Sequence, residues 1–171
     1  VATIQTPGGT GAIRQLYEAI KKINAEATLW LSDPTWPSHV GIARHMGMPM
    51  RSYSYFDAAT SNVDFDAMIH DLADVKPQDV VMLHGCCHNP TGANLDAAQW
   101  EAITDLLLAK GAIPFVDIAY QGFGDGLDAD AAGLRAMAAR VPEMLIAASC
   151  SKNFGLYRDR VGCAMAICES A

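Results

Sequence analysis

Short apolar runs that alternate with stretches of helical periodicity constrain the fold of this chain more than any other feature of its sequence. The clearest runs lie at residues 79–84, 112–117 and 144–148, and they have the apolar character of strands buried in a sheet. Between them, apolar residues recur every three or four positions, as in amphipathic helices. This alternation predicts an α/β fold in three layers, αβα, with a mainly parallel sheet and right-handed crossovers.

The remaining segments extend this alternating plan. A glycine-rich turn at residues 6–11 precedes apolar residues at helical spacing, namely Ile13, Leu16, Ile20 and Ile23. We expect further strands at residues 27–32, 51–55 and 161–168. We also expect five helices: one after residue 11, one from 38 to about 47, one around 65–72, one from a capping box at Asp96 and Gln99 to Gly111, and one around 134–137.

The composition favours one soluble globular domain over residues 1–171. With 51% hydrophobic and 18% charged residues, the chain can bury a sizeable core and is not a disordered tail. A net charge of −7 without any block rich in Lys or Arg argues against nucleic acid or an anionic membrane as a partner. No apolar stretch approaches the roughly 18 residues that a membrane span requires.

The cysteines indicate a reducing, cytoplasmic setting, because five is an odd number and their spacing does not suggest a disulfide framework. His84, Cys86, Cys87 and His88 offer the imidazole and thiolate groups that bind zinc. Against a metal site, the side chains of adjacent cysteines in a strand-like segment point apart, and no second ligand pair occurs elsewhere. We therefore interpret Cys86 and Cys87 as buried, inert thiols and expect no metal.

Several polar loops are expected to meet at one edge of the sheet. Thr10, Trp36, Asn89, Asp117 and Lys152 each lie in a loop that adjoins a strand or opens a helix. Ligands of open α/β sheets bind in the crevice at the carboxyl ends of the strands. The sequence therefore predicts one crevice lined by five separate loops.

Lys152 is the residue of this crevice with the most specific chemistry. It follows the apolar run at 144–148 after a short polar loop, so it leaves the end of a strand. A partly desolvated amine at such a site can be neutral near pH 7 and attack a carbonyl. The alternative is an ordinary solvated lysine, which is the usual fate of this residue type.

Two of these loops need a charged partner. Residues 8–11, Gly-Gly-Thr-Gly, precede a helix, where free backbone amides and the helix dipole bind a phosphate-sized anion. They match neither the dinucleotide-binding nor the P-loop pattern, and a plain turn is the alternative. Asp117 ends an apolar strand and needs a partner, because a buried carboxylate is costly unless it is paired. That partner is Arg160, a capping interaction or a protonated ring nitrogen of a ligand.

Taken together and in order, these loops resemble those of a known enzyme family. The segments are GGTG at 8–11, DPTWP at 33–37, HNPTG at 88–92, DIAYQGF at 117–123 and SCSKNFG at 149–155 with Arg160. They occur in this order in the aspartate and aromatic amino-acid aminotransferases. Over essentially its whole length, the chain resembles the large domain of that fold-type-I, pyridoxal-phosphate-dependent family.

The resemblance implies how the ring of pyridoxal phosphate would be held. Lys152 would form a Schiff base with the cofactor and then shuttle the proton between the substrate Cα and the cofactor. Asp117 would pair with the pyridine nitrogen and keep it protonated. Trp36 would stack on the ring, while Asn89 and Tyr120 would hydrogen-bond its phenolic oxygen. The implied catalytic residues are Lys152, Asp117 and Tyr120.

The resemblance also implies a cradle for the cofactor phosphate. Arg160 would supply a charge-assisted fork, and the glycine turn would supply backbone amides. His39 would support the site from behind Trp36, and we expect Tyr157 and Arg158 to be neighbours of the site rather than ligands. The residues implied to bind the phosphate are Gly9, Thr10, Ser149 and Arg160.

By resemblance, the complete enzyme would transfer the amino group of an L-amino acid to 2-oxoglutarate, with aspartate favoured and aromatic amino acids as the other option. Members of the family take a substrate arginine from a C-terminal small domain, and an arginine and a tyrosine from the partner subunit of a homodimer. None of the three is assigned in this chain, so we expect the N-terminal arm and the small domain to lie outside it. The alternative is a non-catalytic module that binds pyridoxal phosphate.

Overall fold

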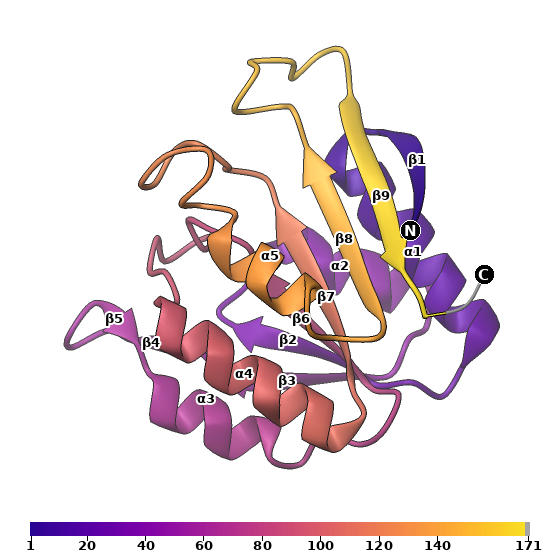
Figure 1. Ribbon diagram of the computed structural model, residues 1–171. Coiled ribbons are helices and arrows are strands. Elements are labelled where there is room, and N and C mark those ends of the chain that lie inside the picture. The colour runs from indigo at the N-terminus through magenta and orange to yellow at the C-terminus, as the bar shows by residue number, and fades with distance from the viewer. Residues whose placement is uncertain (170–171) are drawn as a thin grey trace.

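The computed structural model describes residues 1–169 as a seven-stranded sheet with helices on both faces (Figure 1). The strands of this sheet are β1 (Ala2–Pro7), β2 (Leu29–Asp33), β3 (Met50–Ser54), β6 (Val80–His84), β7 (Ile113–Ile118), β8 (Met144–Ser149) and β9 (Val161–Ile167). The helices are α1 (Gly8–Ile23), α2 (Pro37–His45), α3 (Phe65–Leu72), α4 (Ala97–Lys110) and α5 (Ala132–Ala138), and β4 (Phe56–Asp57) pairs with β5 (Asn62–Val63) in a separate hairpin.

The strand order of the large sheet is β1-β9-β8-β7-β6-β2-β3. The five strands from β8 to β3 run parallel to one another, whereas β9 is antiparallel to both of its neighbours. The predicted three-layer α/β fold with a mainly parallel sheet is therefore confirmed. Because the parallel strands all end at one edge, the loops that follow them converge there.

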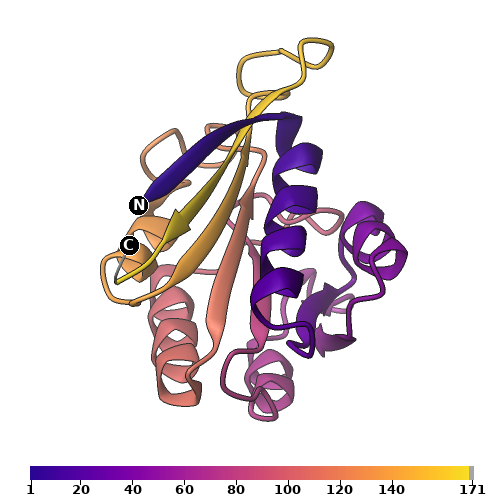
Figure 2. The ribbon, with the colours of Figure 1, turned by 90° about the vertical axis from the view of Figure 1, so that its right-hand side faces the viewer.

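The sheet separates two hydrophobic cores, which explains why its central strands are apolar throughout (Figure 2). Val80 and Met82 of β6 pack on the side of α1 and α2, while Val81 and Leu83 pack on the side of α3, α4 and α5. Successive side chains of a strand point to opposite faces, so a strand covered on both faces needs apolar residues at every position. Burial stabilises the fold by about 1.5–3 kcal/mol for each large aliphatic side chain.

The ends of α4 follow directly from local sequence. The Asp96 carboxylate accepts the backbone N–H of Gln99 at 2.8 Å, and the Gln99 side chain accepts the backbone N–H of Asp96 at 2.9 Å. At the other end, Gly111 adopts φ +65°, a conformation that costs other residues energy. The predicted capping box and the predicted helix stop are both confirmed.

The N-terminal segment differs from the sequence prediction. Residues 2–7 form strand β1, and α1 begins at Gly8, so the turn predicted at 6–11 is wrong. β1 is an edge strand with only Thr6 buried, so it lacks the alternating or continuous apolar pattern that marks the other strands. The short hairpin of β4 and β5 was not predicted either, because two-residue strands carry no periodic signal.

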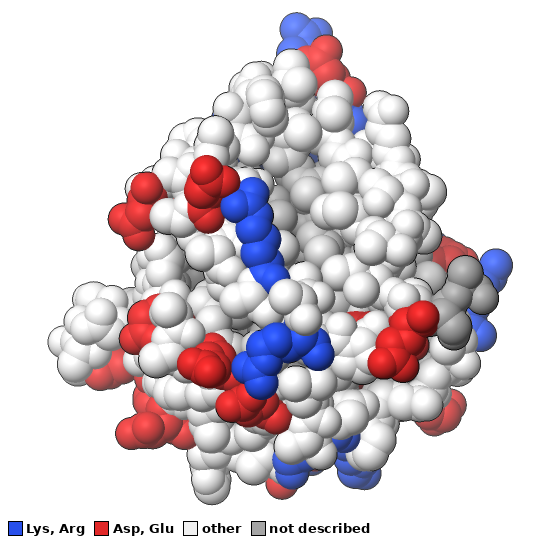
Figure 3. Space-filling model, in the orientation of Figure 1, with Lys and Arg blue, Asp and Glu red and all other residues white. Residues whose placement is uncertain are grey.

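The described surface has no single-sign character on the face that carries α4 and α5, where acidic and basic side chains are interspersed (Figure 3). Ion pairs there join Arg135 to Asp128 at 2.9 Å and Arg140 to Asp105 at 2.5 Å. Exposed pairs of this kind contribute little to stability. Among residues 1–169, no helix has the length and apolar character needed to cross a membrane.

Candidate active site

A cavity of about 220 Å³ lies at the carboxyl ends of the parallel strands. Its walls come from the start of α1, the loops after β2, β6 and β7, and the loop between β8 and β9. This is the edge at which the sequence predicts a crevice. Every residue implied by the resemblance lies on its wall, namely Gly9, Thr10, Trp36, Asn89, Asp117, Tyr120, Ser149, Lys152 and Arg160.

Lys152 reaches this cavity from the loop that extends beyond the end of the sheet between β8 and β9 (Figures 1 and 2). Its ammonium lies 4.7 Å from the centroid of the Tyr120 ring and 5.9 Å from that of Tyr157. Aromatic faces attract a cation weakly, by about 0.5–1 kcal/mol at exposed sites. The Lys152 side chain makes no hydrogen bond or ion pair with the described residues, so its amine is available to a ligand.

Asp117, near the end of β7, is held by a histidine rather than by an arginine. Its side-chain Oδ2 accepts the Nε2–H of His39 at 2.9 Å, and His39 is completely buried. His39 also meets the Trp36 ring edge to face, with the ring centroids 5.3 Å apart. Among residues 1–169, Arg160 makes no ion pair with Asp117, so Arg160 is not the partner of this carboxylate in the structure.

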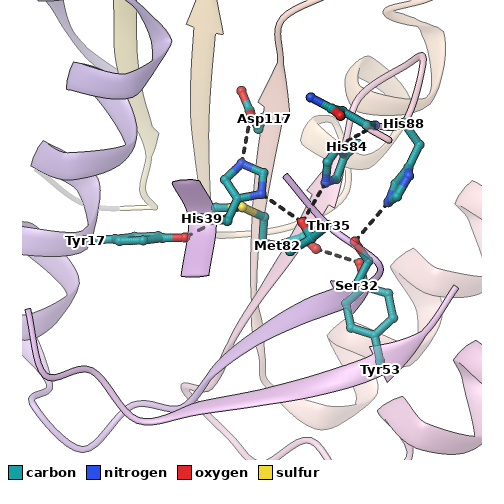
Figure 4. A network of polar contacts seen from close by, with 10 residues as sticks. Tyr17, Ser32, Thr35, His39, Tyr53, Met82, His84, His88 and Asp117 are labelled. Carbon is teal, nitrogen blue, oxygen red and sulfur yellow. Dashed lines mark hydrogen bonds and ion pairs between the residues drawn. The ribbon is translucent and has the colours of Figure 1, made fainter. Parts of the chain in front are cut away.

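A chain of hydrogen bonds continues from His39 through Thr35 to His84, and its direction is fixed at both ends (Figure 4). The backbone N–H of Asn89 donates to His84 Nδ1 at 3.3 Å, so His84 carries its proton on Nε2. His84 Nε2 therefore donates to the Thr35 hydroxyl at 3.2 Å, and Thr35 donates to His39 Nδ1 at 3.0 Å. Every bond points toward Asp117, and each stabilises its negative charge.

Two further histidines of this region are neutral because they are buried. Burial lowers the pKa of His84 well below its usual value, and electrostatic coupling to His88 and His39 lowers it further. Burial, followed by electrostatic coupling to His39, lowers the pKa of His88 to about 4. The His88 ring stacks on Tyr55 with a centroid separation of 3.9 Å and lies 4.1 Å from the His84 ring. Its nitrogens bond Ser32 and Thr91, both at 2.9 Å.

The opposite part of the wall suits an anion. Helix α1 begins without a side-chain cap and without an acidic residue in its first turn, so its first backbone amides are free. The guanidinium of Arg160 lies directly over Gly8, where an added Cβ would come within 2.6 Å of it. At Gly9, an added Cβ would come within 3.0 Å of Ser149 Cβ. Both glycines therefore allow the helix start, Arg160 and Ser149 to meet closely.

The structure also brings in residues that the sequence did not assign to the cavity. Tyr157 lies on its wall, and that it is a neighbour rather than a ligand of the site stays a prediction. Cys86 and His84 line it as well, whereas Arg158 does not. Burial raises the pKa of the Cys86 thiol to about 12, so that thiol is protonated at neutral pH. Their position after an apolar strand was the available signal for His84 and Cys86.

The family model for aminotransferases of class I and II matches residues 1–171 of the chain. That match covers the whole sequence and all five loops of the cavity. The chain belongs to the aminotransferase class I and II family. The resemblance that the five loop segments suggest is thereby confirmed for this aminotransferase-family chain.

Two curated relatives illustrate the likeness. An aromatic-amino-acid aminotransferase of Paracoccus denitrificans is 58% identical over 170 residues, which are 99% of this chain and 43% of that protein. An aspartate aminotransferase of Escherichia coli (strain K12) is 46% identical over 169 residues, which are 98% of this chain and 43% of that protein. The chain thus spans less than half the length of the curated relatives that it matches.

Solved structures agree with the sequence comparison. An aromatic amino acid aminotransferase with 3-indolebutyric acid has a TM-score of 0.97 and 58% identity, over 98% of this chain and 43% of that chain. An aromatic-amino-acid aminotransferase from Burkholderia pseudomallei, covalently bound to pyridoxal phosphate, has a TM-score of 0.95 and 41% identity, over 98% of this chain and 42% of that chain. The fold of this aminotransferase-family chain is therefore that of aminotransferases.

Proposed function

We propose that the complete protein containing this chain transfers the amino group of an L-amino acid to 2-oxoglutarate, with pyridoxal phosphate held on Lys152. One observation carries the proposal. A free amine, a buried carboxylate and a guanidinium beside a helix start, from Lys152, Asp117 and Arg160, line a single cavity. An amine that attacks a carbonyl, an acceptor for a ring N–H and an anion cradle are the groups that this cofactor needs.

The donor set of the cavity fits the cofactor. Among residues 1–169, His39 is the one side-chain partner of the Asp117 carboxylate and bonds Oδ2, which leaves Oδ1 for a protonated ring nitrogen. The uncapped start of α1, the guanidinium of Arg160 and the Ser149 hydroxyl suit a phosphate. Trp36 provides an aromatic face on the same wall. Cation, anion and stacking contacts are thus available together.

The cofactor, when bound, supplies a carbonyl carbon that reacts with amines and a ring that withdraws electrons from the substrate Cα. Lys152 would hold that carbon through Nζ and, once freed by the substrate amine, would carry the proton from the substrate Cα to the cofactor as a general base and then a general acid. Asp117 would hold the proton on the ring nitrogen, because the chain of hydrogen bonds through His39, Thr35 and His84 stabilises the negative charge of its carboxylate.

Asn89 and Tyr120 are proposed to orient the ring by donating hydrogen bonds to its phenolic oxygen. Burial, then the charges of Tyr157 and Asp117, raises the pKa of the Tyr120 hydroxyl above its ordinary value. Tyr120 therefore keeps its proton at neutral pH and serves as a donor. Asn89 is positioned by its own backbone, which donates to His84.

The amino donor is proposed to be aspartate or an aromatic amino acid. Relatives named for both activities match the chain, at 58% identity for an aromatic-amino-acid aminotransferase and 46% for an aspartate aminotransferase. We propose that the complete protein accepts both, with 2-oxoglutarate as the amino acceptor. Measurement of kcat/KM for aspartate and for phenylalanine tests this directly, and activity with only one of them or with neither contradicts it.

The complete enzyme is further proposed to be a cytoplasmic homodimer. All five cysteines are free thiols, which supports a reducing compartment. The exposed rings of Phe154 and Tyr157 follow Lys152 in the same loop, and exposed apolar surface of this kind supports an interface with a second subunit. Sedimentation analysis of the complete protein tests the dimer, and a monomer at working concentration contradicts it.

Substitution of the lysine tests the proposed reaction. In the complete, cofactor-loaded protein, Lys152→Ala is expected to lower the transamination rate by at least ~10⁴-fold, because the covalent anchor and the general base are lost together. Lys22→Ala, at an exposed position near the end of α1, is the matched control and is expected to retain full activity. Wild-type protein that binds the cofactor but transfers no amino group would instead support the non-catalytic module.

A further inference from the structure

Cys86, Cys87 and Asp130 form a compact cluster next to the candidate active site, whose wall includes Cys86. Their two sulfur atoms and one carboxylate oxygen all lie within 4.8 Å of one another. The sequence expectation that these thiols point apart is wrong, because Cys87 adopts φ +46° instead of an extended conformation. Such a conformation costs a non-glycine residue about 1–2 kcal/mol. The Asn94 side chain accepts the Cys87 backbone N–H at 2.6 Å and holds this bend.

The carboxylate of Asp130 is already oriented toward the thiols by backbone groups. Its Oδ2 accepts the N–H groups of Gly122 and Gly124 at 2.7 and 3.0 Å, and its Oδ1 accepts that of Asp125 at 2.8 Å. A carboxylate oxygen accepts about two hydrogen bonds, so Oδ1 keeps a free lone pair. Ligands fixed in this way by outer hydrogen bonds bind metals more tightly than mobile ones.

The cluster has its own access from solvent. Cys86 and Asp130 line a second cavity of about 360 Å³, between the start of α4 and α5. Asp96 and Asp125 lie on the same wall, so the cavity concentrates cations. Cys86 also lines the candidate active site, which makes this residue a shared wall of the two cavities.

We propose that Cys86, Cys87 and Asp130 bind a thiophilic divalent cation such as Zn²⁺. Bond lengths of ~2.3 Å to sulfur and ~2.0–2.2 Å to oxygen place tetrahedral ligand atoms roughly 3.5–3.8 Å apart. The three ligand atoms therefore need to approach one another by up to about 1.3 Å, which side-chain rotation supplies. The cation displaces the two thiol protons to solvent, and water from the second cavity completes the tetrahedron.

Binding of a cation to this cluster is expected to change the wall of the candidate active site. Cys86 follows Gly85, whose backbone N–H donates to the carbonyl of Asp117 at 2.8 Å. A cation that draws Cys86 toward Asp130 therefore displaces the wall beside Asp117 and Tyr120. The cation is expected to inhibit the proposed reaction, although its binding does not depend on that reaction.

Cadmium titration of the complete, cofactor-loaded protein tests the site, because cadmium thiolates absorb in the ultraviolet. After removal of metals with a chelator, Cd²⁺ is expected to give one thiolate band that saturates at one ion per chain. Cys87→Ser is expected to weaken binding by at least ~10-fold and to reduce the band. Cys168→Ser, at an exposed cysteine outside the cluster, is the matched control and is expected to bind as the wild type does.

Two results would overturn the proposal. One is a folded wild-type protein that shows no cadmium thiolate band. The other is a band of unchanged strength and affinity in Cys87→Ser, since cadmium would then be bound by other cysteines. Thermal unfolding of each variant establishes that it is folded, and Asp130→Asn is expected to weaken Cd²⁺ binding while leaving both thiols in place. Because the readout is cadmium absorbance, failure of the amino-transfer proposal does not affect it.

Discussion

The two walls of the active-site cavity are built in opposite ways. On one wall, the Asp117 carboxylate is buried and bonded to His39, which is bonded in turn to Thr35. On the other wall, the Lys152 side chain makes no hydrogen bond with the described residues, and Arg160 is exposed and donates to the backbone carbonyl of Tyr157 at 3.0 Å. The carboxylate wall is thus organised before any ligand binds, whereas the lysine and arginine are left free to contact one.

The two walls differ because their residues face different physical requirements. A buried carboxylate without partners would be costly, so the protein stabilises Asp117 with aligned hydrogen bonds. An amine that must form and break a covalent bond cannot be tied to a fixed partner. Substitutions on the carboxylate wall should therefore impair the chemistry, and substitutions at Arg160 should impair cofactor binding.

On the carboxylate wall, the largest expected effect is that of Asp117→Asn, which removes the charge without removing the side-chain volume. We expect kcat of the complete protein to fall by about 10²–10³-fold, the usual loss when a preorganised electrostatic contact is removed, with cofactor still bound. Asp128→Asn, at an exposed position outside the cavity, serves as the control. Steady-state kinetics measure the effect, and an unchanged kcat would contradict the proposed role of Asp117 in the reaction.

A smaller effect, on binding, is expected for Arg160→Ala. A hydrogen bond to a charged group contributes about 1.5–3 kcal/mol, so the dissociation constant of the cofactor should rise by roughly 10–150-fold. Arg158→Ala is the matched control, because Arg158 lies in the same loop but does not line the cavity. Titration of the cofactor-free complete protein measures both values. Equal affinities for the two variants would show that Arg160 does not hold the phosphate.

A further effect concerns the stability of the protein, to which the buried His88 contributes in a pH-dependent way. His88 has a folded-state pKa of about 4 and an unfolded-state pKa near 6.5, so the unfolded chain binds more protons between these values. The free energy of unfolding should therefore decrease as pH falls from about 6.5 to about 4, by up to about 3 kcal/mol from His88 alone.

Denaturant unfolding at several pH values measures this slope in the wild type and in His88→Gln. The variant is expected to lose part of the slope, whereas His45→Gln, at an exposed position, is expected to keep it. An identical slope in wild type and His88→Gln would mean that His88 is not held neutral, and that the carboxylate wall is less organised than the hydrogen bonds indicate.

Local sequence signals predicted the middle of the fold better than its edges. The capping box of Asp96 and Gln99 and the apolar strand β6 depend on neighbouring residues or on burial of both faces, so they leave a pattern. Strand β1 is mostly exposed and is defined by its pairing with β9, such as Ala2 opposite Ala166. A pairing across the whole length of the chain leaves no local periodicity to detect.

The site follows the same rule. The residues on the cavity wall could be placed from strand ends and from the resemblance, because each belongs to a recognisable loop. The contact between His39 and Asp117 joins residues 78 positions apart, so no local pattern reveals that a histidine is the partner of the carboxylate. The bend at Cys87, which brings two thiols together, depends on a hydrogen bond from the Cys87 backbone N–H to the Asn94 side chain, and no local sequence pattern reveals it.

The most direct test of the account is to locate the covalent bond between cofactor and protein. The complete protein is loaded with pyridoxal phosphate, reduced with borohydride and digested, and the modified peptide is identified by mass spectrometry. The account predicts the added pyridoxyl group on Lys152 and on no other lysine of this chain. Modification of a different lysine, or no modification of a folded, cofactor-loaded protein, would contradict it.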